Sequence, residues 1–462
     1  MVYVLTSTIK FHNRKGFGRV EITNPISVEI EKNIKNEENF CTIVVSKNIF
    51  GTIDRLGNGE TFGGIFHDFG AVKGVNGESM ELGSFVEVSL GYNRADAEYF
   101  SGFINNINLD GDFVTIRVQD YSYILKKLVL DMDTKTRTLK EIGDFIIEKA
   151  NEYLLNNYSG FLYNNGGFGD QVFSTSPVTP EPIDINYVFP DFKIHNFKLS
   201  KANGLDVLKY LRDKFIIDSF MSSNIIYLNY ALDQKAFDSW NEKNTKVFTL
   251  VSDRFLKGAD VLLEEGVDKN NFVKELPTGY NYILSTQNLK YQYGEEILRK
   301  YIIKSISPRT GKEVKVEVGN DGGDKHTIVL IPDKDEYTED DLRKMYKQLE
   351  LKYTYTGFKK GSTFTTYGMP VINLYEPVAF VGVGFKDESN TPYQISQANA
   401  YLVTGKKVTF GEGGFRQEVE IGIKLQLSGD IFNEDVFFQG DGNKLKGTDL
   451  NIFDGTQKLF LE

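Results

Sequence analysis

Cysteine is almost absent from this chain of 462 residues, in which Cys41 stands alone. One thiol forms no disulfide within the chain, so a disulfide framework is excluded. Cys41 lies in the apolar run FCTIVVS, a setting that favours a buried structural thiol over a reactive one. Histidine is scarce too, and its four side chains lack the spacing of a zinc motif: His12, His67, His195 and His326.

Long apolar runs are also missing. No stretch approaches the roughly 18 apolar residues that span a bilayer, so we expect no membrane insertion. The start MVYVLTSTIKFHN lacks the charged and apolar regions of a signal peptide and indicates a strand. We therefore expect synthesis in the cytoplasm, with any extracellular role reached by assembly into a particle.

Clusters of positive charge are a third absence. The formal net charge is −11, and no run of lysine and arginine suggests a basic face. Nucleic-acid-binding surfaces are usually basic, because neutralisation of phosphates supplies much of the affinity. We predict no stable nucleic-acid binding, although an acidic balance is compatible with a channel through which DNA passes.

Aromatic residues and glycine are plentiful, with 35 Phe, 25 Tyr and 43 Gly against 11 Pro. Aromatic side chains favour strands and interfaces, and glycine suits tight turns. A chain of this length accommodates about two to four domains. The composition thus predicts a β-rich protein that assembles with partners.

The first 128 residues indicate an all-β domain. Apolar residues alternate with polar ones, and the alternation predicts one buried face, as in a barrel wall: Val86, Val88 and Leu90, then Val114, Ile116 and Val118. The Gly-rich stretch 51–77 has no clean period and is interpreted as an insertion. The predicted strands cover residues 2–11, 26–34, 41–46, 85–92, 99–109 and 113–120, with a hairpin turn at 109–112.

Helices are predicted in the middle of the chain. Thr138 and Glu141 form a capping box before a helix that extends to Tyr158. Ser200 or Asn203 is placed to cap a second helix, whose apolar stripe is more typical of a core than of a ligand site: Leu205, Leu208, Leu211 and Phe215. Two short strands at 218–221 and 225–229 follow this helix.

The last part of the chain returns to strands. Strands are predicted at 297–307, 313–319 and 326–331, followed by a helix from about Thr338 to Leu351. Next comes YTGFKKGSTFTTYGMP, a polar hinge leading into a strand that ends on Gly-x-Pro. A strand pair then closes on GEGGFRQEVEIG.

This order of motifs resembles the tail hub proteins of contractile phages, the family that includes the late control D proteins. The matches lie at 83–92, 100–104 and 114–126 in the first domain and recur in the last quarter, 353–424. The resemblance implies a mainly β fold with α+β insertions. It comprises two tail-tube-like antiparallel β-barrel domains and helix-containing connecting domains.

The resemblance also implies a domain plan. Residues 1–128 form a first tube-like β-barrel domain, and 129–194 a helix with a loop-rich connector. An α+β region at 195–350 contributes to the second barrel and to an inserted domain. Residues 351–425 complete the second barrel, and 426–462 form a C-terminal extension.

The function implied is that of a structural hub in the baseplate of a phage tail or related injection system. A homotrimeric ring would adapt the sixfold tail tube to a threefold central spike. The residues after Lys424 offer no room for an oligosaccharide-binding barrel or a β-helix, so a separate spike protein is expected. Other implied partners are the tail tube protein, the baseplate wedge proteins and the tape measure protein. The implied location is the virion tail tip, after assembly in the host cytoplasm.

Acidic motifs with some likeness to metal sites fail in detail. Asp131, Asp133 and Lys135 start like a calcium loop, but glycine at the sixth position and a carboxylate at the twelfth are missing. Asp333 and Asp335 fail the same glycine test. We expect no enzyme and no catalytic, cofactor-binding or metal-binding residues. Two alternatives stay open: a tail-tip cell-wall hydrolase acting through paired carboxylates, and a tail protein that binds host glycans.

Overall fold

The chain divides into two compact units, each made of segments that are distant in sequence. The first comprises Met1–Ala231, Arg299–Glu350 and Lys407–Phe415, and the second comprises Leu232–Leu298, Leu351–Lys406 and Arg416–Glu462. The computed structural model describes residues 4–158, 180–228, 246–250, 281–345 and 357–426, with breaks at 13–18, 36–37, 47–49, 54–60, 64, 67–71, 74–78, 81, 94, 188–192, 216, 218, 286, 290, 293–298, 308, 320–323, 331–336, 359–360, 383–384, 387–391 and 394–398.

The first unit is built on an antiparallel sheet in the order β3-β4-β12-β11-β10-β1-β2-β5-β6. Its strands are β1 (Leu5–His12), β2 (Arg19–Ile22), β3 (Ser27–Asn33), β4 (Phe40–Ser46), β5 (Phe50–Ile53), β6 (Thr61–Gly63), β10 (Phe85–Tyr92), β11 (Ala95–Asp110) and β12 (Phe113–Gln119). The six strands predicted between residues 2 and 120 are all present.

β2 was not predicted from the sequence, and the stretch 51–77 was predicted to be an insertion without a clean period. In the structure, β5 and β6 extend the main sheet, and β7 (Ile65–Phe66), β8 (Val72–Lys73) and β9 (Ser79–Met80) form a small separate sheet. Strands of two to four residues are too short for alternation to be recognised, so periodicity gave no signal for them.

One face of the main sheet is buried, as the alternation predicts. The apolar side chains on this face are 0% exposed on β10 and β12: Val86, Val88, Leu90, Val114, Ile116 and Val118. Register shifts at Val88/Ser89 and Ile104/Asn106 bend β10 and β11, since a bulge increases the local twist of a strand. The turn between β11 and β12 is tight, and Gly111 takes the positive φ of 55° that it requires.

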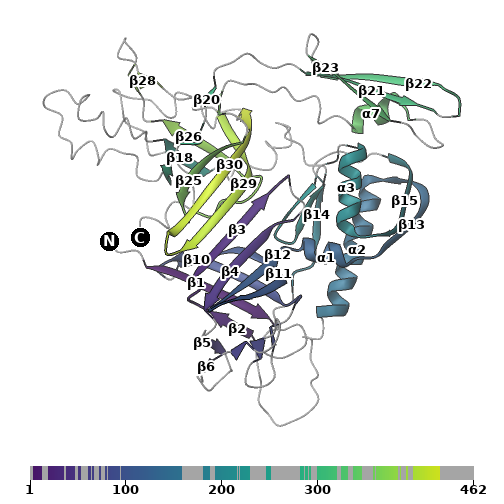
Figure 1. The fold of residues 1–462 in the computed structure, drawn as a ribbon. Coiled ribbons are helices and arrows are strands. Elements are labelled where there is room, and N and C mark those ends of the chain that lie inside the picture. The colour runs from purple at the N-terminus through teal and green to yellow at the C-terminus, as the bar shows by residue number, and fades with distance from the viewer. Residues whose placement is uncertain are drawn as a thin grey trace, which may run out of the picture. The chain divides into compact units, whose positions relative to one another are not determined.

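A helical layer packs against one end of the opposite sheet face. It contains α1 (Ser122–Lys127), α2 (Leu139–Tyr158) and α3 (Gly204–Phe215), with the bent ribbon of β13 (Leu130–Thr138) and β15 (Lys193–Ala202) beside α2 and α3 (Figure 1). Phe85, Phe103 and Tyr121 connect the sheet to this core through ring contacts. A small sheet in the order β14-β17-β16 lies in the same unit: β14 (Asp184–Tyr187), β17 (Ile225–Leu228) and β16 (Ser219–Ser222).

The predicted helix caps are present. The Glu141 amide donates to Thr138 Oγ1 at 3.1 Å, and the Thr138 amide donates to Glu141 Oε2 at 2.9 Å, which completes the capping box before α2. Asn203 caps α3 by accepting the Asp206 amide at 2.9 Å, which decides between the two predicted caps. The stripe of α3 is buried in the core, as predicted.

A second small sheet of the first unit has the order β22-β21-β23 and packs beside α7 (Glu339–Met345). Its strands are β21 (Arg299–Ile306), β22 (Glu313–Gly319) and β23 (Asp324–Leu330). Ile303 and Val316 lie in the same core as Leu342 of α7. The predicted continuation of this helix to Leu351 lies outside the described residues.

In the second unit, the hydrogen-bonded strand order closes on itself. The order is β26-β18-β19-β25-β30-β29, and a further antiparallel pairing joins β29 back to β26. Unlike the antiparallel pattern expected, β18 pairs in parallel with both of its neighbours. The strands are β18 (Lys246–Leu250), β19 (Asn281–Ser285), β25 (Ser362–Tyr367), β26 (Pro377–Gly382), β29 (Asn399–Gly411) and β30 (Gly414–Gln426).

The second unit also contains shorter paired strands. A glutamine on β30 holds the segment after β25 by hydrogen bonds. β20 (Tyr291–Gln292) pairs with β24 (Gly357–Phe358), and β27 (Phe385–Lys386) pairs with β28 (Pro392–Tyr393). Gln417 Nε2 on β30 donates to the carbonyls of Gly368 at 2.6 Å and Pro370 at 2.7 Å. The predicted mainly β fold with several antiparallel sheets is thus confirmed.

Candidate functional site

The residues considered for metal binding or catalysis are dispersed. Among the described residues, no group of three or more His, Cys, Asp or Glu side chains is placed to hold a metal ion. Asp131 accepts a hydrogen bond from the Lys201 amide at 2.8 Å, so one of its oxygens has a structural role. His67, Asp333 and Asp335 lie outside the described residues. No described helix is long and apolar enough to cross a membrane.

Two described histidines have separate local contacts. His12 Nε2 lies 3.0 Å from Glu87 Oε2, and its ring lies 5.8 Å from that of Phe85. His195 packs edge-on against Tyr337, with ring centroids 4.7 Å apart. His195 Nδ1 also lies 3.2 Å from Thr136 Oγ1, so each ring is held by neighbours from its own part of the fold.

Cys41 is fully buried in the first sheet, as its apolar run predicts. Burial raises the pKa of the thiol above its ordinary value, because a thiolate loses its hydration there. The nearby Lys32 opposes this shift in pKa and is the weaker influence. Since the thiolate is the reactive form, Cys41 is a core residue in this structure.

A buried polar network that was not predicted from the sequence lies where the sheet meets the helical layer. Asp120 is 3% exposed; it accepts hydrogen bonds from Asn39 Nδ2 at 2.7 Å and from the Ser122 amide at 3.0 Å. Asn39 Nδ2 also donates to the Met221 carbonyl at 3.0 Å. Burial raises the pKa of Asp120 to about 6, although the hydrogen bonds and Lys32 favour the charged form.

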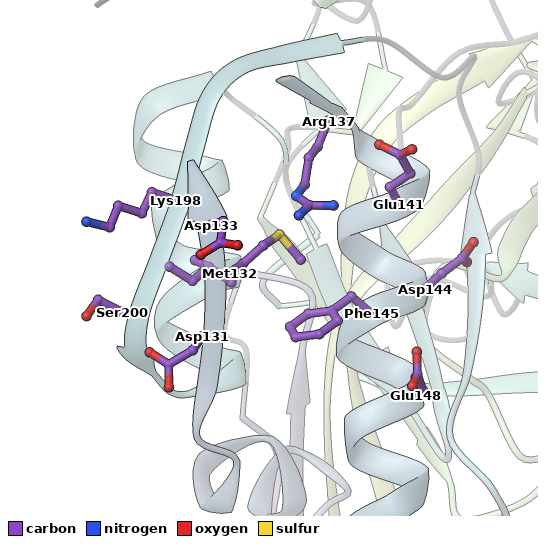
Figure 2. A pocket seen from close by; sticks show the side chains of 11 residues that line it. Asp131, Met132, Asp133, Arg137, Glu141, Asp144, Phe145, Glu148, Lys198 and Ser200 are labelled. Atoms are coloured by element: carbon purple, nitrogen blue, oxygen red, sulfur yellow. The ribbon is translucent and has the colours of Figure 1, made fainter. Parts of the chain in front are cut away.

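A groove of about 660 Å3 lies between β13 and α2 (Figure 2). Glu141, Asp144 and Glu148 line it from α2, and their spacing places them on one face of the helix. Asp131 and Asp133 line it from β13. This helix spacing and the alternation on the strand were visible in the sequence, but the position of β13 beside α2 was not.

A smaller hollow of about 230 Å3 lies on a polar face of the main sheet, lined by residues of β3, β4, β11 and β12. The Arg117 guanidinium lies over the Phe40 ring, 3.9 Å from its centroid. Lys407 forms ion pairs with Glu29 at 2.7 Å and Glu31 at 3.3 Å. These charges are paired or stacked, so the face presents little net charge to a partner.

Comparison with known proteins finds similar solved structures at low sequence identity. No protein-family model matches the sequence, and no curated protein matches it. A tail protein from Neisseria meningitidis MC58 aligns at 10% identity with a TM-score of 0.47, covering 91% of this chain and 96% of that one. The 43 kDa tail protein of prophage MuSo2 from Shewanella oneidensis aligns at 10% identity with a TM-score of 0.47, covering 90% and 98%.

A third similar structure is the E. coli c3393 protein, a component of the type VI secretion system that is described as similar to the T4 tail proteins gp27 and gp5. It aligns at 8% identity with a TM-score of 0.40, covering 91% of this chain and 78% of that one. The first two similar structures are tail proteins, and the third is a component of a secretion system.

Proposed function

We propose that this chain is a structural protein of a phage tail or related injection machine, and that it acts there as a trimeric baseplate hub. The observation that carries the proposal is the closed strand order of the second unit, in which β29 returns to β26. Such closure is the defining feature of a barrel. The bent sheet of the first unit supplies the second tube-like domain of the pair that the resemblance requires.

Two tube-like domains per chain explain how a threefold assembly meets a sixfold tube. Three chains arranged in a ring present six such domains, one opposite each subunit of a sixfold ring. Among the described strands of the first sheet, β6 has a single neighbour, β5. Pairing with the next chain would cover such an edge and suppress unwanted aggregation.

The remaining features of the proposal follow from the resemblance. The ring would bind the tail tube protein on one side and a separate spike protein on the other, with wedge and tape measure proteins around and within it. The chain would act mechanically and not as an enzyme. Its location would be the tail tip of the virion, after assembly in the host cytoplasm.

Light scattering on the purified full chain tests the proposal. A trimer has a mass of about 157 kDa, which is three times the chain mass of 52.4 kDa. Electron microscopy of the same sample should then show rings with six lobes. A mass of one chain at every concentration, together with cleavage of purified cell wall or retention on host glycans, would instead favour the hydrolase or the glycan-binding protein.

A further inference from the structure

The groove between β13 and α2 has an apolar floor and acidic walls. Met132 and Leu199 of the floor are buried, and Phe145 is half-buried. Figure 2 shows Phe145 pointing across the groove towards Met132, with carboxylates on both sides. An apolar floor between charged walls suits a ligand with both apolar and charged groups.

Five carboxylates line the groove against two cations, Arg137 and Lys198. Three of the carboxylates use one oxygen within the fold: Asp131 accepts the Lys201 amide, Glu141 the Thr138 amide, and Asp144 the Tyr187 hydroxyl at 2.8 Å. Asp133 and Glu148 form no hydrogen bond or ion pair with another described residue, and both are exposed. The groove therefore keeps an excess of negative charge.

Arg137 adds a second feature that indicates a ligand. Its Nε is buried and has no acceptor among the described residues, although buried donors are nearly always paired. In Figure 2 the guanidinium points into the space between β13 and α2. A backbone carbonyl from a bound segment is the acceptor that would satisfy this donor while cationic side chains met the carboxylates.

From these features we infer that the groove docks an extended, basic peptide segment of another protein, with arginine or lysine alternating with apolar residues. The acidic walls favour a cationic occupant, so the expected partner is a protein that presents arginine or lysine side chains to the groove. The volume of about 660 Å3 is within the range of pockets that hold small ligands, so a few residues are enough to fill it. The inference stands whether or not the chain forms a ring.

Fluorescence anisotropy with the full-length protein tests this inference. The probe is a labelled hexapeptide in which arginine alternates with leucine, and the comparison peptide has glutamine in place of arginine. The groove variant is Asp133→Asn with Glu148→Gln. The control variant is Glu152→Gln with Asp213→Asn, which changes the net charge by the same amount at exposed positions outside the groove.

We expect the arginine peptide to bind the natural chain and the control variant equally, and the groove variant about tenfold more weakly, as loss of two exposed charge contacts implies. The glutamine peptide should not bind. Equal weakening by both variants would reveal non-specific attraction and overturn the inference. Displacement of the peptide by spermine as readily as by unlabelled peptide would overturn it as well, since the groove would then be a small-cation site.

Discussion

The buried carboxyl of Asp120 makes a specific prediction about stability and pH. Its folded pKa of about 6 lies above the ordinary value of 3.8, chiefly because burial disfavours the charged form. A raised folded pKa means that the folded state binds the proton more tightly than the unfolded state does. The resulting stabilisation is complete below pH 3.8 and is lost as the pH rises through about 6.

The expected size follows from these two values. Over the whole range the shift corresponds to about 3 kcal/mol, at about 1.4 kcal/mol per unit. As the pH falls from 7.5 to 5, the folded state takes up the proton and the unfolded state mostly does not. Asp120 alone should therefore raise the free energy of unfolding by about 1.4 kcal/mol over this change in pH. Asp120 is 3% exposed, so solvent screening removes little of this effect.

The perturbation that isolates this effect is Asp120→Asn, which keeps the size of the side chain and removes its titration. The variant should be less stable at every pH, because in either orientation its amide nitrogen would face a donor, Asn39 Nδ2 or the Ser122 amide. What matters is the slope: its gain in stability between pH 7.5 and pH 5 should be smaller than that of the natural chain by about 1.4 kcal/mol.

Urea denaturation followed by circular dichroism measures the free energy of unfolding at each pH and at constant salt, and the difference between pH 7.5 and pH 5 gives the slope. The matched control is Asp110→Asn, which removes a carboxylate from the exposed end of β11, outside the Asp120 network. The same slope in the natural chain and in Asp120→Asn would refute the reasoning, because the proton would then be bound elsewhere.

Three further predictions concern stability measured by urea denaturation at neutral pH. Thr138→Ala removes half of the capping box before α2 and should cost about 1 kcal/mol, whereas Thr134→Ala at an exposed position of β13 should cost less than about 0.5 kcal/mol. Ile116→Ala leaves a cavity in the buried face of the first sheet and should cost about 2–5 kcal/mol. Gln417→Leu removes the donor to the carbonyls of the 367–370 turn and should cost about 1–3 kcal/mol; no change in stability would show that water replaces that donor.

Local features of the fold could be predicted because each depends on residues close together in sequence. The alternation of Val114, Ile116 and Val118 identified a half-buried strand, and it needed no knowledge of the neighbouring strands. The caps at Thr138 and Asn203 were visible for the same reason, since a cap bonds an amide two or three residues away. Strands as short as β7 and β8 gave no comparable signal.

The groove and the Asp120 network could not be predicted, because their members meet only through tertiary packing. Asp120 and Asn39 are 81 residues apart, and Met221 is a further 101 residues along the chain from Asp120. Asp133 and Glu148 are closer in sequence, but their meeting requires β13 to pair with β15 and turn back against α2. The spacing of Asp131 and Asp133 within their own strand carries no information about α2, whose carboxylates line the same groove.

Closure of the strand order in the second unit could not be predicted either, because it depends on strands that are distant in sequence. The hairpin of β29 and β30 was predictable, because its strands are long and its turn GEGG lies between them. What closes the strand order is β18, a five-residue strand that pairs in parallel with β26 and β19. Parallel strands are joined by a long connection, so no hairpin turn in the sequence indicates that they pair. The long antiparallel strands of this unit can therefore be identified from the sequence, while the strand that completes the order lies more than a hundred residues earlier in the chain than its partner β26.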